Sequence, residues 1–146
     1  MSDTGRLSIA FEPNFANVNM VRAAVRGICA DFFRLDCNAA SIMDFCLIVT
    51  ELMNNAVEHS NAKKIKVELL LSEHEAVFRL ISAGHGFDPT QTAKMPGLEQ
   101  DGDLPDGGYG LALIQALVDG MEYEHQENRN MVTLRKRFPV NPGEDQ

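Results

Sequence analysis

The sequence predicts an α+β protein, a two-layer sandwich in which about three helices cover one face of a mostly antiparallel, mixed sheet of about five strands. Two long segments carry apolar residues in steps of three and four, which is typical of helices with one buried face. Two pairs of consecutive strand-like segments are each separated by a short polar turn. Single strands do not alternate with helices, so a doubly wound parallel sheet is not expected.

The first half of the chain supplies one strand and both long helices. Residues 7–11 alternate apolar and polar side chains and end before Pro13, which indicates a short strand. A helix is expected over about residues 15–33, and its apolar face consists of Val18, Val21, Val25, Ile28 and Phe32. A second, central helix is expected to end near His59, and its apolar face consists of Ile42, Phe45, Val49, Leu52 and Ala56.

The second half supplies four strands and one further helix. Residues 64–71 and 76–82 are two predicted strands joined by a turn, and residues 121–125 and 131–138 are two more. Between these pairs, helical spacing returns at Leu111, Ile114, Leu117 and Val118. Residues 84–108 are rich in glycine and proline, and a loop of this length is typically a lid, a binding loop or a disordered segment.

The composition indicates a single domain over residues 1–146, with a core of about residues 7–138 and a loose tail over residues 139–146. No unbroken apolar run approaches the roughly 20 residues of a membrane span, and the first residues lack the apolar run of a signal peptide. A net charge of -8 argues against a nucleic-acid partner, which favours basic surfaces. Cys29, Cys37 and Cys46 lack metal-ligand spacing, so we interpret them as buried apolar thiols of a cytoplasmic protein.

A polar stripe lies beside the apolar face of the central helix. Glu51, Asn55 and His59 are spaced four residues apart, so their side chains lie above one another on successive turns. Carboxylate and carboxamide oxygens are suited to Mg²⁺ and to holding a water or hydroxyl beside it. The alternative is a solvated polar stripe that ends the helix near Ser60, and the helix alone does not decide between the two.

Two glycine clusters flank the long loop. Gly84 and Gly86 follow a buried strand, where glycine lets the backbone turn sharply and approach a ligand. Gly107, Gly108 and Gly110 open the next helix, whose free amide groups and dipole make its N-terminus an anion site. Neither cluster is specific alone, because loops need glycine in any case. The sequence contains no Walker A, Gly-x-Gly-x-x-Gly or His-Glu-x-x-His motif.

Taken in order, these motifs resemble the ATP-binding domain of the GHKL superfamily, the Bergerat fold, and within it the small anti-sigma factor serine/threonine kinases. The resemblance covers about residues 7–138. Residues 51–56, Glu-Leu-Met-Asn-Asn-Ala, match the N box together with His59, and residues 84–89, Gly-His-Gly-Phe-Asp-Pro, match the glycine part of the G1 box. Residues 108–111, Gly-Tyr-Gly-Leu, match the G2 box, and residues 132–134, Val-Thr-Leu, resemble the last strand.

The resemblance implies a role for each matching position. Asn55 would ligate a Mg²⁺ that bridges the phosphates of ATP, and Glu51 would be the general base toward a partner's serine hydroxyl. Asn54 is the other candidate for the metal, but it points roughly 80° or more away from the stripe, so Asn55 is favoured. Backbone amides of Gly108 and Gly110 would hold phosphate. The remaining positions that would line the ATP site are His59, Ser82, Gly84, Gly86, Leu111 and Thr133.

Three positions depart from the family pattern. The G1 box should begin with an Asp that accepts the adenine amino group, but Ser82 stands there and is shorter and neutral. Residues 99–106 carry four carboxylates against the lone Lys94 of the loop, where a kinase would profit from a cation near the γ-phosphate. Residues 128–130, Asn-Arg-Asn, stand where the last box is expected to contain glycine. These departures concern nucleotide affinity rather than the fold.

The sequence therefore favours an anti-sigma-type regulatory protein that binds Mg·ATP, docks a sigma factor or an anti-sigma antagonist, and phosphorylates the antagonist on serine. The alternative is a binding module that keeps the fold and the docking surface but has lost catalysis. Ser82, in place of the expected Asp, favours this alternative. A detached histidine kinase domain is a third candidate, but 146 residues leave no room for a dimerisation helix pair. Neither nucleic acid nor a membrane is expected as a direct partner, and a homodimer is left open.

Overall fold

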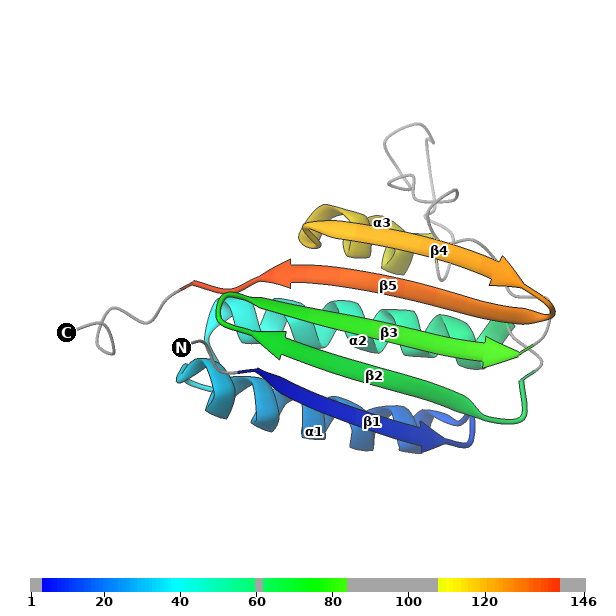
Figure 1. The fold of residues 1–146 in the computed structure, drawn as a ribbon, viewed down its shortest axis with the longest axis horizontal. Coiled ribbons are helices and arrows are strands. Elements are labelled where there is room, and N and C mark those ends of the chain that lie inside the picture. Colours follow the sequence, from blue (N-terminus) through cyan, green and yellow to red (C-terminus); the bar gives the residue numbers. More distant parts are fainter. Residues whose placement is uncertain (1–3, 60–61, 84–107, 140–146) are drawn as a thin grey trace, which may run out of the picture.

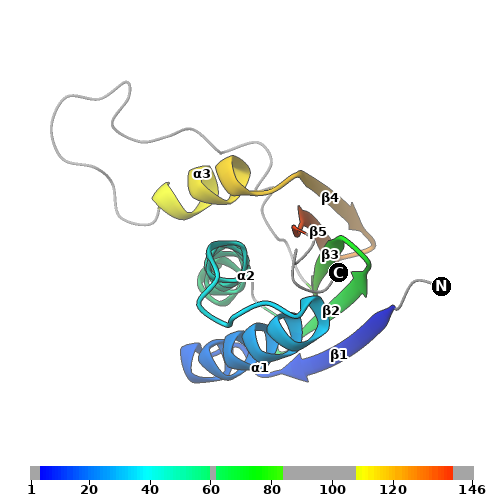
Figure 2. The ribbon, with the colours of Figure 1, turned by 90° about the vertical axis from the view of Figure 1, so that its left-hand side faces the viewer.

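The computed structural model describes residues 4–59, 62–83 and 108–139. Five strands are present in this part of the chain: β1 (Gly5–Phe11), β2 (Ile65–Ser72), β3 (Glu75–Ala83), β4 (Gly120–Gln126) and β5 (Arg129–Arg137) (Figure 1). The helices are α1 (Phe15–Phe33), α2 (Ala40–His59) and α3 (Gly108–Leu117). All three lie on the same side of the sheet (Figure 2), which confirms the predicted two-layer α+β architecture.

The five described strands form one sheet in the order β1-β2-β3-β5-β4. Each neighbouring pair is antiparallel, so this sheet is antiparallel throughout rather than mixed. The turn between β4 and β5 places Glu127 and Asn128 at positive φ angles of 49° and 65°. Two such residues are typical of a type I′ turn, whose twist fits a hairpin. The order leaves β3 in the middle of the sheet, and Ser82 near its end.

Helix α2 lies between α1 and α3 and supplies much of the core (Figure 2). Its predicted apolar face is buried: Ile42, Phe45, Val49, Leu52 and Ala56. The ring of Phe45 packs edge-on against the ring of Phe78 in β3, with the ring centroids 6.5 Å apart. By length and composition the stretch Ala40–Glu58 could cross a membrane, a test that the core helix of a globular protein also passes, and half of it is buried here.

Helix α1 begins with a side-chain cap. The Oδ1 of Asn14 accepts a hydrogen bond from the backbone N–H of Asn17 at 2.8 Å, one of the free donors of the first turn. Replacing Asn14 by alanine should lower the free energy of unfolding by about 1 kcal/mol, because that donor loses its acceptor. Urea unfolding followed by circular dichroism would measure the change. Asn14→Ser keeps an acceptor, so an equal loss in both variants would contradict the capping role.

The structure corrects the prediction for one cysteine. Cys29 and Cys46 are buried as expected, but Cys37 is exposed in the connection between α1 and α2. Burial raises the pKa of the Cys29 thiol to about 12. Burial also raises the pKa of the Cys46 thiol, although the guanidinium groups of Arg26 and Arg22 lower it in part. Position 37 follows the end of a helix, where apolar periodicity no longer predicts burial.

Iodoacetamide should therefore label a single cysteine in the folded protein at mildly alkaline pH, because the thiolate is the reactive species. Cys37 is expected to react, whereas Cys29 and Cys46 should react only after unfolding. Mass spectrometry of tryptic peptides, with and without denaturant, would show the difference. If Cys46 were labelled as fast as Cys37 in the folded protein, the burial of that thiol would be contradicted.

Candidate functional site

The start of β2, the end of β3, the start of β5 and the C-terminal end of α2 lie at the same end of the molecule, at the right of Figure 1. Ile65 at the start of β2 is paired with Ser82, and Ser82 is paired with Asn130 near the start of β5. Paired residues of neighbouring strands place their side chains on the same face of a sheet. Ile65 belongs to the buried core, so Ser82 and Asn130 also face the helical layer, next to the C-terminal end of α2.

The polar stripe of α2 is directed toward α3. Cys46 and Thr50 line a cavity together with residues of α1, so this side of α2 faces α1. Asn55 lies about 180° around the helix from Cys46, and Glu51 lies about 40° from Asn55. Because α2 lies between α1 and α3 (Figure 2), Glu51 and Asn55 face the α3 side. Glu51 is half-buried there, whereas Asn55 is only 5% exposed.

The carboxamide nitrogen of Asn55 is left unpaired within the described part of the chain. Its Nδ2 is buried and has no hydrogen-bond partner in the described part of the chain. A buried polar group left unpaired costs about 1–3 kcal/mol, so this side chain is available to a group that the described residues do not supply. Asn54, the other candidate for the metal, is half-buried and is turned about 100° away around the helix.

This arrangement fits a magnesium ion that is held mainly by the phosphates of a ligand. Mg²⁺ commonly takes one or two protein oxygens and completes its octahedron with phosphate oxygens and waters. Rotating the amide of Asn55 would present its oxygen where the nitrogen lies. Among residues 4–59, 62–83 and 108–139, no group of three or more His, Cys, Asp or Glu side chains could hold a metal by itself. The magnesium would therefore depend on the nucleotide.

Ser82 and Asn130 form a buried polar pair, with 5% and 3% of their surfaces exposed. The Oδ1 of Asn130 accepts a hydrogen bond from the hydroxyl of Tyr123 at 2.9 Å and lies 2.6 Å from the Nδ1 of His125. These two partners on β4 fix the orientation of the carboxamide. From the sequence, Asn130 stands out only as a departure from a glycine box, and strand pairing is needed to bring it beside Ser82.

The strand register places Thr133 away from this pair. Successive side chains of a strand point to opposite faces, and Asn130 and Val132 face the helices. Thr133 is paired with Arg79 of β3 and Glu122 of β4, on the face that the helices leave uncovered. The structure therefore does not bring Thr133 together with Ser82 and Asn130.

The glycine motifs and His59 are described only in part. Gly108 and Gly110 lie in the first turn of α3, as expected for a helix start, and Leu111 follows them. Helix α3 leads into the start of β4, at the far end of β5 from Asn130, so its N-terminal end is directed back toward the site (Figure 1). Gly84 and Gly86 lie outside the described residues, together with the rest of the segment 84–107. His59 ends α2, and its side chain is not described.

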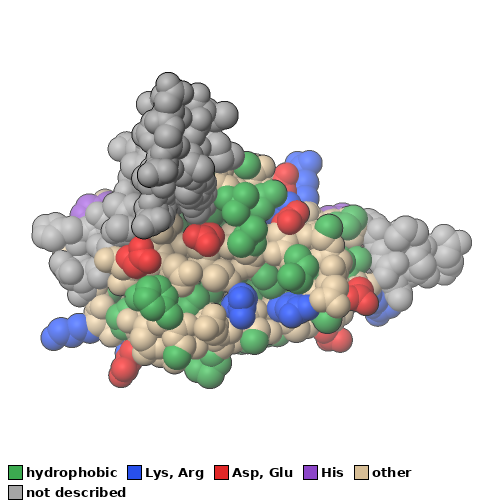
Figure 3. All heavy atoms as spheres, turned by 180° about the vertical axis from the view of Figure 1, so that it is seen from behind, with side chains coloured by type: hydrophobic (Ala, Val, Ile, Leu, Met, Phe, Trp, Pro, Cys, Tyr) green, Lys and Arg blue, Asp and Glu red, His purple; other side chains and the backbone are tan. Residues whose placement is uncertain are grey.

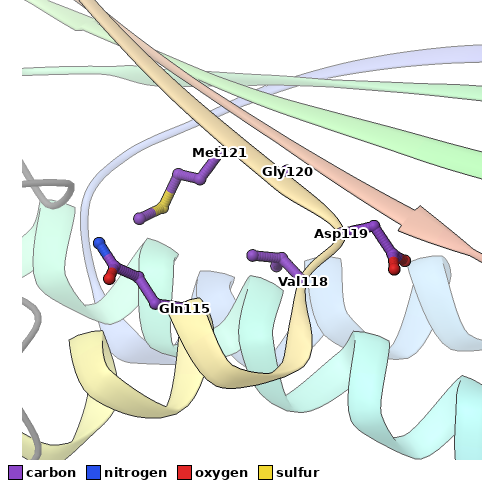
Figure 4. A pocket seen from close by; sticks show the side chains of 5 residues that line it. All are labelled: Gln115, Val118, Asp119, Gly120 and Met121. Atoms are coloured by element: carbon purple, nitrogen blue, oxygen red, sulfur yellow. The ribbon is translucent and has the colours of Figure 1, made fainter.

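A separate cavity of about 280 Å³ lies at the C-terminal end of α3 (Figure 4). Gln115, Val118 and Met121 point toward it, whereas Asp119 points away. The carboxylate of Asp119 accepts a hydrogen bond from the backbone N–H of Arg137 at 2.6 Å, which ties it to the sheet. Helix α3 is ten residues long, so this cavity is about 15 Å from the glycine end of α3 and is not part of the candidate site.

Comparisons with known proteins agree with the fold. The family model described as histidine kinase-like ATPase domain matches residues 11–136. The structure of the RsbU and RsbW domains of Rv1364c from Mycobacterium tuberculosis is similar, with a TM-score of 0.63 and 22% identity; the match covers 94% of this chain and 34% of that one. The structure of the Acinetobacter baumannii histidine kinase AdeS is also similar, with a TM-score of 0.52 and 16% identity; the match covers 90% of this chain and 68% of that one. The sequence matches none of the curated proteins with which it was compared.

Proposed function

This chain belongs to the histidine kinase-like ATPase domain family, and from this premise we propose that it is an anti-sigma-type regulatory protein. It binds Mg·ATP, docks a sigma factor or an anti-sigma antagonist, and transfers the γ-phosphoryl group to a serine of the antagonist in a bacterial partner-switching pathway. The observation that supports this most is the buried, unpaired carboxamide of Asn55, one helical turn from Glu51. The chain spans about a third of the Mycobacterium tuberculosis chain that shares its fold, and the RsbW domain named for that chain supports the proposal.

In this proposal the nucleotide is bound by Asn55, by Ser82 and by the start of α3. Asn55 holds the Mg²⁺ that neutralises charge on the phosphates. The amides of Gly108 and Gly110 bind phosphate oxygens at the positive end of the α3 dipole. Ser82 binds the base beside Asn130 at this end of the sheet, since a hydroxyl can both donate and accept hydrogen bonds.

Glu51 acts on the acceptor protein. Its carboxylate takes the proton of the serine hydroxyl while the hydroxyl oxygen forms a bond to the γ-phosphorus, and ADP leaves with the electron pair of the broken P–O bond. Such a transfer needs positioning and charge neutralisation more than covalent help from the protein. Glu51 is half-buried on the α3 side of α2, so a hydroxyl from a second protein can reach it.

Ser82 supports a second candidate function, a binding module that docks the same partners without kinase activity. A neutral hydroxyl is a weaker acceptor for the adenine amino group than a carboxylate. Calorimetric titration with Mg·ATP separates the two candidates, because the kinase requires a nucleotide complex and the module does not. A dissociation constant below millimolar would support the kinase, whereas weaker binding would favour the module.

Replacing Ser82 by aspartate should tighten Mg·ATP binding by about tenfold or more, because the hydrogen bond to the adenine amino group becomes charge-assisted. Calorimetry on the variant and the wild-type protein would measure the ratio of dissociation constants. Ala83→Asp is the matched control, since it adds the same charge one residue on, at an exposed position on the other face of β3. Equal effects of the two substitutions would mean that Ser82 does not face the base.

A further inference from the structure

A groove between α1 and α2 lies on the helical side of the molecule, the side that Figure 3 shows. It encloses about 240 Å³, and its lining consists of Arg22, Arg26, Met43, Cys46, Leu47 and Thr50. Figure 3 shows apolar and basic side chains next to one another on this side. None of the six residues belongs to the nucleotide site described above.

Met43 and Leu47 form the apolar part of the groove. They lie one turn apart on α2 and are 44% and 40% exposed, although the same helix buries its other large apolar side chains. The remaining large exposed hydrophobic residues of the described chain, Phe15 and Met20, also lie in the helical layer, on α1. Neighbouring apolar side chains exposed beside a groove are typical of a protein contact surface.

The charge of the groove is opposite to that of the chain. The protein has a net charge of -8, but two guanidinium groups line this groove. Arg22 is exposed and has no hydrogen-bond or ion-pair partner in the described part of the chain. Arg26 donates hydrogen bonds to the carbonyl oxygen of Cys37 at 3.0 Å and to the Oδ1 of Asn38, so its guanidinium is held at one end of the groove. A complementary ligand therefore combines carboxylates with an apolar side chain.

The groove also leads toward Glu51, since Leu47 precedes it by one helical turn. We propose that the groove docks an acidic segment of the acceptor protein that carries an exposed apolar side chain. The apolar side chain packs against Met43 and Leu47, and the carboxylates pair with Arg22 and Arg26. The contact would bring a serine of the acceptor protein to Glu51, and this purpose rests on the proposed function. The contact itself does not depend on the proposed function.

Two fluorescein-labelled amphipathic peptides would test the groove. Both carry leucines at helical spacing, and the flanking positions are glutamates in one peptide and lysines in the other. Measured by fluorescence anisotropy, the acidic peptide is expected to bind at least about tenfold more tightly than the basic one. Added salt should weaken its binding, because the charges are exposed. Equal affinities, or no binding of the acidic peptide, would overturn the proposal.

Single substitutions then locate the contact. Arg22→Glu reverses a groove charge and Leu47→Ser removes an apolar contact, and each should weaken binding of the acidic peptide by about tenfold or more. Arg6→Glu makes the same charge reversal on β1, on the uncovered face of the sheet, and should leave the affinity unchanged. If Arg6→Glu weakens binding as much as Arg22→Glu, or if Arg22→Glu changes the oligomeric mass in light scattering, the proposal is wrong.

Titration of the same variants with Mg·ATP separates this inference from the proposed function. Arg22 and Leu47 do not line the nucleotide site, so ATP affinity should be the same in both variants as in the wild-type protein. If the wild-type protein binds the acidic peptide in the groove but does not bind ATP, the docking surface is supported and the proposed kinase function is wrong. If it binds ATP but not the acidic peptide, the proposed docking surface is wrong and the proposed kinase function is not affected.

Discussion

Replacing Glu51 by glutamine is expected to slow phosphoryl transfer to the acceptor protein by a factor of about 100 to 10,000, the usual contribution of a general base. Glutamine keeps the shape of the side chain and a hydrogen-bond acceptor but cannot take the serine proton. Mg·ATP should bind the variant about as well as the wild-type protein, because Asn55 rather than Glu51 is assigned to the metal. The effect therefore belongs to the transfer step and not to nucleotide binding.

Single-turnover transfer from labelled ATP to a candidate antagonist would measure the rate, with calorimetry as the check on binding. Glu58→Gln is the matched control, since it removes the same charge from an exposed position of the same helix. Normal transfer by the Glu51 variant would exclude this residue as the base. Loss of transfer in both variants would point instead to the charge of α2 as a whole.

The helices could be predicted from the sequence because each buries one continuous face. The predicted span 15–33 coincides with α1, and the apolar residues assigned to the central helix are all buried in α2. The same helical periodicity predicts that Asn55 and Asn54 point in different directions. The structure agrees, since Asn55 is buried and Asn54 is half-buried. Side-chain direction in a helix follows from about 100° of rotation per residue, so no tertiary information was needed to predict that the two carboxamides point in different directions.

The contribution of β5 to the site could not be predicted in the same way. Val132, Thr133 and Leu134 are all buried, so the sequence does not reveal which alternate residues face the helices. Shifting the register of a strand by one residue exchanges its two faces. The pairing of Ser82 with Asn130 decides the register, and it joins strands that are separated in the sequence by residues 84–107, α3 and β4. A resemblance confined to residues 132–134 therefore indicated the strand but not which residue of it lies beside Ser82.

Replacing Asn55 by alanine is expected to remove the stabilisation that Mg·ATP gives the protein, without destabilising the unliganded fold. The unpaired Nδ2 of Asn55 costs about 1–3 kcal/mol in the absence of ligand, and its removal offsets the packing that is lost. With Mg·ATP at about 100 times its dissociation constant, the wild-type protein should gain about 2.7 kcal/mol. Loss of the metal ligand should lower the affinity by about 100-fold, which removes most of that gain.

Thermal unfolding of the variant and the wild-type protein, each with and without Mg·ATP, would measure both effects together. Asn54→Ala is the matched control, because it deletes the same carboxamide from the neighbouring position, which faces away from the stripe. If Asn54→Ala loses the ATP-dependent shift and Asn55→Ala retains it, the metal ligand has been assigned to the wrong residue. If Asn55→Ala unfolds at a much lower temperature without ligand, the carboxamide supports the fold. Only the ligand-dependent change in stability should be large, because the cost of the unpaired Nδ2 offsets the packing of this side chain until the ligand is bound.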